Sequence, residues 1–263
     1  MDKDFAASRA IKNGWDGMSG DYQTLSEIST QDIHYSPFGP GEKQLGLIGD
    51  IQGKDFIELG CGAGQNSLAV ASQGGNKVLG VDISGRQLKA AAHLADKTNQ
   101  DIGLIQADVQ NLDFIKSESF DVVMSMFALE FVSDLNRFFE NCHRLLVNDG
   151  ILILSTVHPL SAFEWDSETG TLLVDNYLNP PVELWGREDP DSINPATTFF
   201  RTIEEIVNSM LGAGFQIRTL LEPAALDKIT AGVTPYGGAY WEPFFERFEK
   251  VPFALVIKAS KVG

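Results

Sequence analysis

The chain is poor in cysteine and contains no long apolar run. Its two cysteines, Cys61 and Cys142, do not make the disulfide framework of a small secreted domain. No stretch reaches the apolar length that a bilayer-spanning helix needs, and the first residues open no run like that of a signal peptide. These absences favour a reducing environment without a membrane, so we expect a cytoplasmic protein.

Basic side chains are also scarce. The 263 residues include 20 Lys and Arg against 36 Asp and Glu, which gives a formal net charge of −16. Nucleic-acid binding draws its non-specific affinity from Lys and Arg, and anionic lipid surfaces attract the same side chains. The charge therefore disfavours a nucleic acid or a membrane as partner, and it is compatible with a neutral or cationic small substrate.

From about residue 54 the chain alternates between strand-like and helix-like segments. Short apolar segments typical of buried strands cover residues 54–59, 77–81, 102–107, 120–126, 151–155, 215–221 and 253–259. Helical spacing is clearest after Asp134, where apolar residues recur at i, i+3, i+4 and i+7. This alternation predicts an α/β fold of the Rossmann-like kind, with a seven-stranded, mostly parallel sheet and helices on both faces.

Two irregular stretches interrupt the alternation. Residues 157–198 contain five prolines and no clear period, and residues 231–248 are rich in glycine and aromatic residues. A long irregular stretch inside a compact domain is often functional, so we expect a lid insertion after the fifth strand. We expect residues 1–50 to form an N-terminal helical cover of the ligand site, and residues 51–263 to form the main domain that carries both insertions.

A glycine-rich turn follows the first strand, in the run Glu58-Leu59-Gly60-Cys61-Gly62-Ala63-Gly64. Such a turn lets the backbone approach a ligand closely and aims the N–H groups of the next helix at it. The dinucleotide fingerprint G-x-G-x-x-G would need a glycine at position 65, where the chain has Gln65. The turn by itself indicates a nucleotide-binding fold, and the missing glycine argues against a dinucleotide.

Three carboxylates accompany this turn. Asp82 ends the second strand, where it could accept both hydroxyls of a ribose, and Asp108 ends the third, where it could accept an adenine amine. Glu58 lies just before the turn. With no Lys or Arg in the loop, the set suits a cationic nucleoside better than a diphosphate. A lone strand-end Asp is also typical of a helix N-cap, and that alternative stays open.

Four motifs, in order and spacing, resemble the successive cofactor motifs of the class I S-adenosylmethionine-dependent methyltransferases: E-L-G-C-G-A-G at 58–64, V-D-I-S at 81–84, A-D-V at 107–109 and F-D-V-V at 120–123. The segment 15–22 resembles the N-terminal W-D-x-x-A-x-x-Y of the small-molecule branch, with Ser19 in place of the alanine. The resemblance covers about residues 40–155. It implies an enzyme with S-adenosylmethionine as cofactor.

The resemblance also implies roles for the matched residues. Those implied in cofactor binding are Tyr22, Glu58, Gly60, Cys61, Gly62, Gly64, Asp82, Ile83, Asp108, Val109 and Phe127. The glycines and Phe127 would lie beside the methionine part. Asp82 would bind the ribose, and Ile83 would lie against the adenine. Asp108 and Val109 would hold the edge of the adenine.

Methyl transfer from a sulfonium is an in-line displacement, so the protein mainly positions the reactants and, where needed, removes a proton. An amine acceptor needs only to be neutral, whereas a hydroxyl benefits from a general base. The catalytic candidates by position are His158, directly after the fifth strand, and Glu130, after the fourth. His-Pro at a strand exit is equally typical of a structural turn, and His34 in the N-terminal segment fits either role. We assign no metal site.

The sequence therefore predicts transfer of a methyl group from S-adenosylmethionine to a small molecule. Its acidity slightly favours an amine over a hydroxyl, and the aromatic residues of the insertions fit a flat or cationic acceptor. Two alternatives stay open. One is an NAD(P)-dependent oxidoreductase on a similar sheet, and the other is a methyltransferase-like protein that only binds a nucleoside or a partner.

Overall fold

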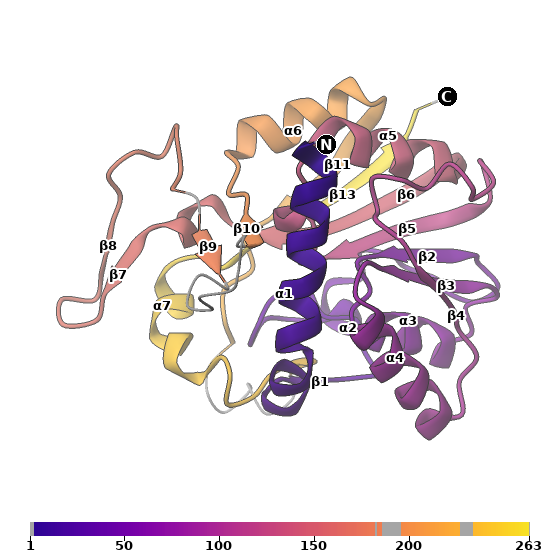
Figure 1. The fold of residues 1–263 in the computed structure, drawn as a ribbon, viewed down its shortest axis with the longest axis horizontal. Helices are drawn as coiled ribbons and strands as arrows, with labels where there is room; N and C mark the ends of the chain where they lie inside the picture. The colour runs from indigo at the N-terminus through magenta and orange to yellow at the C-terminus, as the bar shows by residue number, and fades with distance from the viewer. Residues whose placement is uncertain (1–2, 182, 186–195, 227–233, 263) are drawn as a thin grey trace.

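The computed structural model describes residues 3–181, 183–185, 196–226 and 234–262. Its centre is a seven-stranded sheet in the order β11-β13-β6-β5-β2-β3-β4 (Figure 1). In chain order the strands are β2 (Phe56–Leu59), β3 (Val78–Asp82), β4 (Gly103–Gln106), β5 (Phe120–Met126), β6 (Leu146–Val157), β11 (Phe215–Leu221) and β13 (Ala254–Lys261). Strand β13 runs antiparallel to both neighbours, and the other pairs in the sheet are parallel. The predicted seven-stranded, mostly parallel sheet is confirmed.

Helices flank the sheet on both sides, as predicted. The four that follow its strands are α3 (Gln65–Ser72), α4 (Gly85–Thr98), α5 (Leu135–Leu145) and α6 (Ile203–Gly212). Helix α5 begins after Asp134, whose carboxylate accepts the Arg137 N–H at 2.9 Å. Helix α6 begins with a capping box in which Thr202 and Glu205 bond each other's backbone N–H groups. The helix predicted after Asp134 is confirmed.

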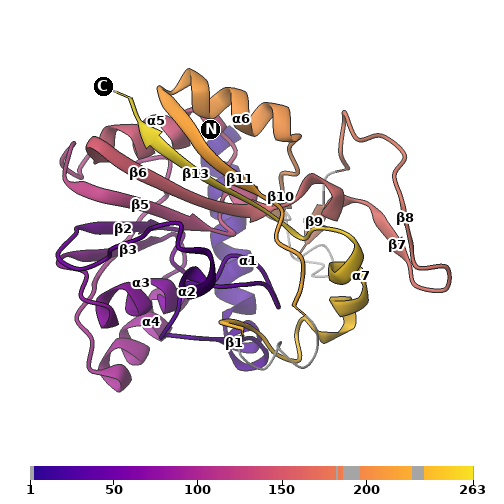
Figure 2. The same ribbon diagram turned by 180° about the vertical axis from the view of Figure 1, so that it is seen from behind.

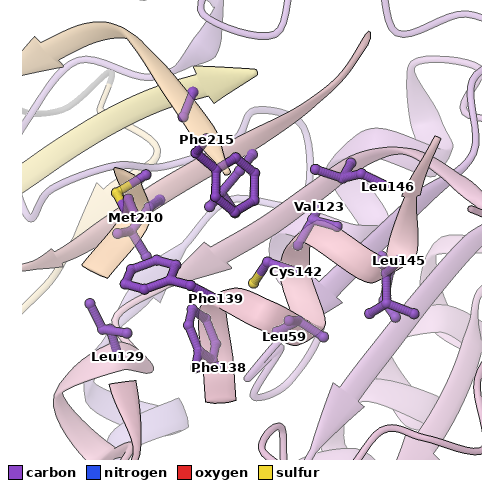
Figure 3. Close-up of a cluster of buried hydrophobic side chains, with 14 of the residues drawn as sticks. Leu59, Val123, Leu129, Phe138, Phe139, Cys142, Leu145, Leu146, Met210 and Phe215 are labelled. Atoms are coloured by element: carbon purple, nitrogen blue, oxygen red, sulfur yellow. The ribbon is translucent and has the colours of Figure 1, made fainter. Parts of the chain in front are cut away.

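Two apolar layers form the core, one on each face of the sheet. Along β5, Val123 belongs to the layer under α5 and α6, while its neighbours Val122 and Met124 belong to the opposite layer, as the period of two along a strand requires. Figure 3 shows the first layer, where Phe139 of α5 and Met210 of α6 lie in one cluster of buried side chains.

The opposite layer is closed by the segment that follows the first helix. Ile33 and Tyr35 pack into it, and one buried carboxylate, that of Glu42 in the short helix α2 (Glu42–Leu45), organises the segment. Glu42 accepts the Tyr35 hydroxyl at 2.6 Å and the backbone N–H of Ile48 at 2.7 Å. Residues 26–50 are therefore mostly irregular and contribute buried side chains to this layer, and the predicted N-terminal cover formed by residues 1–50 stays a prediction.

Helix α1 (Lys3–Leu25) is the helical part of that N-terminal region. Figure 1 shows it lying across the edge of the sheet at which the parallel strands end. After it, β1 (Glu27–Ile28) pairs antiparallel with β12 (Tyr236–Gly237), which precedes the helix α7 (Phe245–Lys250). This pairing brings the start of the chain against the second irregular stretch, of which residues 231–233 lie outside the described ranges.

The first irregular stretch contains two small hairpins. One is β7 (Glu164–Asp166) with β8 (Thr171–Leu173), and the other is β9 (Glu183–Trp185) with β10 (Ala196–Thr198). Figures 1 and 2 both show the β7–β8 hairpin projecting away from the sheet. Residues 186–195 lie outside the described ranges, and a lid function for the stretch stays a prediction.

Within the described ranges, no helix combines the length and apolarity needed to cross a membrane. The cytoplasmic location stays a prediction.

Candidate active site

A cavity of about 430 Å³ lies at the edge of the sheet where the parallel strands end. Its wall includes residues at or just beyond the carboxyl ends of five neighbouring strands: Gly60, Ile83, Asp108, Phe127 and Val157. Ligands of open α/β sheets bind at this edge. The fold therefore brings residues from the ends of five strands to the wall of one cavity.

The cavity gathers ten of the eleven predicted cofactor residues. They are Tyr22, Glu58, Gly60, Cys61, Gly62, Asp82, Ile83, Asp108, Val109 and Phe127. The eleventh, Gly64, is the N-cap of α3 and has a φ of +74°. A Cβ there would lie 3.2 Å from the Ala91 Cβ and 3.3 Å from the Ile102 Cδ1, so this glycine lets the turn pack against its neighbours.

The glycine turn passes very close to the chain beyond β5. Gly60 has a φ of +76°, and a Cβ added to it would fall on the Cβ of Ala128. Gly62 has a φ of +53° but faces open space, with nothing within 4 Å of an added Cβ. The first glycine is thus required by packing, and the second leaves room on the cavity side.

Asp82, at the end of β3, is held beside this turn. One carboxylate oxygen accepts the Gly62 N–H at 2.8 Å, and the other accepts the Ser84 N–H at 2.8 Å. The N-cap of α4 is Ser84, whose hydroxyl accepts the Gln87 N–H, so the N-cap alternative for Asp82 does not apply. Each carboxylate oxygen keeps a second lone pair that a diol could use.

Glu58 is a buried carboxylate that supports the start of α3. It accepts the Ser67 N–H at 3.0 Å, the Ser67 hydroxyl at 2.5 Å and the Asn66 amide at 3.1 Å. Burial raises its pKa to about 7, against the lowering effect of these hydrogen bonds. It lines the cavity and fixes Asn66, which in turn accepts the backbone N–H of His34 at 3.1 Å.

Helix α1 also contributes residues to the wall of this cavity. Five of its six wall residues recur every three or four positions, as one face of a helix must: Ser8, Ile11, Trp15, Met18 and Tyr22, with Gln23 as the sixth. The Ser8 hydroxyl donates to Asp108 at 2.5 Å, and the Tyr22 hydroxyl bonds that of Tyr236 in β12. The predicted role of Tyr22 as a cover has a geometric basis in this face.

Opposite the glycine turn the wall is aromatic. We call the residues Phe127, Tyr236, Tyr240, Trp241, Phe248 and Phe253 the aromatic subsite. Their rings pack edge to face or tilted, with centroids 4.8 Å apart for Tyr240 and Trp241 and 5.6 Å apart for Phe127 and Phe253. Such spacings are typical of stabilising ring contacts. Three separate parts of the chain contribute to this subsite.

Glu130, one of the two predicted catalytic residues, lies on the cavity wall in the short 3-10 helix η1 (Leu129–Phe131). It is 4% exposed and accepts the Thr156 hydroxyl of β6 at 3.0 Å. Burial raises its pKa to about 7, so near neutrality it exchanges a proton readily. Its position and its pKa are both compatible with acid–base chemistry in the cavity.

The raised pKa of Glu130 predicts a pH-dependent stability. Between pH 4.5 and about 7 the folded chain binds a proton at Glu130 that the unfolded chain releases, so the free energy of unfolding rises as pH falls. Glu130→Gln removes this dependence. We expect the melting temperature of the variant minus that of wild type to be about 5 °C larger at pH 8 than at pH 5. The reason is that Glu130 costs wild type about 2–3 kcal/mol of stability between these pH values, and the variant does not have this cost.

Glu140→Gln is the matched control, because it makes the same substitution at an exposed side chain of α5. His34, whose pKa burial lowers to about 3, acts in the opposite sense but is common to all three proteins. An equal pH dependence in wild type and Glu130→Gln would show that Glu130 keeps an ordinary pKa.

His158, the other predicted catalytic residue, is not on the cavity wall. Its Nδ1 accepts the Leu160 N–H at 3.1 Å, as the N-cap of the turn η2 (Pro159–Ala162), and its Nε2 lies 2.8 Å from a Glu222 oxygen. Both ring nitrogens are thus engaged. This geometry fits the structural turn that the sequence left open and gives no support to a role as general base.

Sequence reasoning assigned no role to several wall residues. Among them is Asn66, which joins Glu58 to His34. The face of α1 did carry a signal, since five of its six wall residues have helical spacing in the sequence. The sequence also marked His34 and the aromatic residues of the late insertion as candidates, but it could not show that they line the same cavity, because this depends on contacts between distant segments.

Comparisons with known proteins agree with this geometry. Residues 57–154 match the family described as "Methyltransferase domain". A crystal structure of an S-adenosylmethionine-dependent methyltransferase from Mesorhizobium loti superposes with a TM-score of 0.67 at 24% identity, covering 83% of this chain and 96% of that one. Residues 57–154 of this chain therefore carry a methyltransferase domain. The predictions of the family, of a methyltransferase enzyme and of its cofactor are confirmed at this level.

Two curated relatives extend the comparison. An uncharacterized protein of Haemophilus influenzae is 28% identical over 251 residues, which cover 92% of this chain and 93% of that protein. The ubiquinone biosynthesis O-methyltransferase of Neisseria meningitidis serogroup C is 30% identical over 152 residues. That match covers 57% of this methyltransferase and 60% of the relative, which is less than two thirds of its length.

Proposed function

We propose that this chain transfers the methyl group of S-adenosylmethionine to a hydroxyl group of a small molecule. The observation that carries the proposal is the shared cavity. Its wall includes ten residues expected to bind the cofactor and, sharing Phe127 with them, the aromatic subsite. A cavity with both parts allows donor and acceptor to meet away from water, which is the main contribution a protein makes to this displacement.

The charges on the cavity wall fit a cationic cofactor. The described wall residues include four carboxyl groups and one Arg or Lys side chain, Arg247, which donates to the Leu160 carbonyl at 2.9 Å. The carboxyl groups are those of Glu58, Asp82, Asp108 and Glu130. When bound, the cofactor supplies an activated methyl carbon on a sulfonium. Asp82 would accept the ribose hydroxyls, and the glycine turn would lie along the methionine part.

A hydroxyl acceptor fits the cavity wall better than the amine acceptor that the net charge favoured. Burial raises the pKa of Glu130 to about 7, so this wall residue is suited to take the proton of a hydroxyl, a step that a neutral amine does not need before transfer. The relative from Neisseria meningitidis is named as an O-methyltransferase. Glu130 could hold or accept a proton beside such an acceptor.

Calorimetry with S-adenosylmethionine, S-adenosylhomocysteine and NAD tests the cofactor. We expect S-adenosylhomocysteine to bind at least 100-fold more tightly than NAD. The cavity wall offers carboxylates, and the glycine-rich turn lacks the third glycine of the dinucleotide fingerprint. Binding of NAD without binding of S-adenosylhomocysteine would refute the proposal. A screen with methyl-labelled S-adenosylmethionine and matched hydroxyl and amine compounds tests the acceptor. Label found only on amines would refute the hydroxyl assignment.

A further inference from the structure

Helix α1 bonds directly to one of the carboxylates on the cavity wall. The Ser8 hydroxyl donates to Oδ2 of Asp108 at 2.5 Å. Both side chains line the cavity and both are partly exposed, so a ligand can reach them. On the other side, Oδ1 of Asp108 accepts the backbone N–H of Gln110 at 2.9 Å and its side-chain amide at 3.2 Å, and the same amide lies 3.4 Å from Oδ2. The carboxylate is therefore fixed between Gln110 and α1.

The sheet order places Asp108 beside the base of a bound nucleoside. Asp108 follows β4, and β4 pairs with β3, which ends at Asp82. The glycine turn follows β2, on the other side of β3. In the cofactor, the base and the methionine part are attached to opposite sides of the ribose ring. With the ribose at Asp82 and the methionine part along the glycine turn, the base extends toward β4 and Asp108.

The bond between Ser8 and Asp108 determines which hydrogen-bonding groups this part of the wall offers. An ionised carboxylate has no donor, and a hydroxyl that donates to it keeps only oxygen lone pairs for a ligand. The two side chains therefore present two neighbouring acceptors. An exocyclic amino group matches them, because it carries two N–H donors. An oxo group would bring its own lone pairs against those of the wall.

Two further contacts hold α1 in this register. Asp16 accepts the Ser84 hydroxyl at 2.6 Å, and the Gln23 carbonyl oxygen accepts the Gln65 amide at 2.6 Å. Ser84 is the N-cap of α4, and Gln65 is the first residue of α3. Helix α1 is thus tied to the beginning of both helices beside the glycine turn, and this position keeps Ser8 against Asp108.

We propose that Ser8 is a specificity-determining residue of the cofactor site, and that with Asp108 it selects a 6-amino purine over a 6-oxo or unsubstituted purine. The inference rests on the proposed function and deepens it, because it assigns part of the recognition of the cofactor to α1. Ser8 orients Oδ2 of Asp108 toward one hydrogen of the amino group, and its own oxygen accepts the other.

Three ligands that differ at the six-position of the purine test this assignment. S-adenosylhomocysteine carries an amino group there, S-inosylhomocysteine an oxo group, and the 6-deamino analogue a hydrogen. By calorimetry we expect wild type to bind S-adenosylhomocysteine about 100-fold more tightly than either analogue, because a site built for an N–H group rejects ligands that lack it. Ser8→Ala should weaken S-adenosylhomocysteine about tenfold and the 6-deamino analogue less than twofold, as the loss of one hydrogen bond predicts.

Two variants serve as controls. Ser8→Thr keeps the hydroxyl and should restore the preference for the amino group to within threefold of wild type. Thr24→Ala removes an exposed hydroxyl of the same helix, which donates to the Gly20 carbonyl, and should leave all three affinities unchanged. An unchanged preference in Ser8→Ala would overturn the inference. An equal loss for all three ligands would overturn it too, because that result indicates a general loosening of α1. If wild type does not bind S-adenosylhomocysteine at all, the proposed function fails with it, so the two failures are distinguishable.

Discussion

Gly60→Ala is expected to lower the melting temperature by about 10 °C and to abolish measurable binding of S-adenosylhomocysteine. Two effects add at this position. A residue with a side chain is strained at a φ of +76° by about 1–2 kcal/mol, and the new Cβ would overlap the Cβ of Ala128. Overpacking of this kind costs about 1–3 kcal/mol more, and in a chain of this size 1 kcal/mol corresponds to about 2–4 °C.

The loss of binding follows because the clash must push the turn away from the chain beyond β5. Phe127, next to Ala128, lies on the cavity wall, so relief of the clash displaces wall residues on both sides. Calorimetric melting and titration with S-adenosylhomocysteine measure the two effects.

Gly62→Ala is the matched control, because it has the same sign of φ in the same turn but open space around an added Cβ. It should lower the melting temperature by about 2–5 °C, from backbone strain alone. The double variant Gly60→Ala/Ala128→Gly removes the overlapping methyl and should recover the packing part of the loss but not the strain. Equal effects of Gly60→Ala and Gly62→Ala would show that the contact with Ala128 is unimportant.

The cofactor side of the site could be predicted from the sequence for a topological reason. Carboxyl ends of parallel strands meet at one edge of the sheet, so Asp82 and Asp108 come together whatever the details of packing. The helical spacing of Ser8, Trp15 and Tyr22 likewise places them on one face of α1. In both cases a local rule and the sheet order were sufficient.

The acceptor side could be predicted only as aromatic residues in the insertions, because no local rule shows that these residues come together. His34 reaches the wall through the hydrogen bond to Asn66, and the late aromatic residues reach it through the pairing of β1 with β12. His158 shows the converse. It follows a strand at the same edge of the sheet, yet its ring caps η2 and contacts Glu222. Position at a strand end brings a residue near the site, and side-chain partners decide whether it faces the ligand.

Asp82→Ala is expected to weaken binding of S-adenosylhomocysteine at least 100-fold. The carboxylate would give two charge-assisted hydrogen bonds to the ribose hydroxyls, each worth about 1.5–3 kcal/mol, and their sum of at least about 3 kcal/mol corresponds to more than two orders of magnitude. The substitution also removes the acceptor for the Gly62 N–H, which loosens the turn. Titration calorimetry of the folded variant measures the change in Kd.

Two further variants separate the ribose contact from damage to the fold. Asp82→Asn keeps one carbonyl oxygen, so it should lose about tenfold and lie between wild type and Asp82→Ala. Ser84→Ala removes the N-cap of α4 beside the same carboxylate, and should reduce stability by about 1 kcal/mol while changing affinity less than threefold. If Asp82→Ala remains folded and binds S-adenosylhomocysteine as wild type does, the carboxylate stabilises the glycine-rich turn and does not bind the ribose. The ribose must then find its partner elsewhere on the wall.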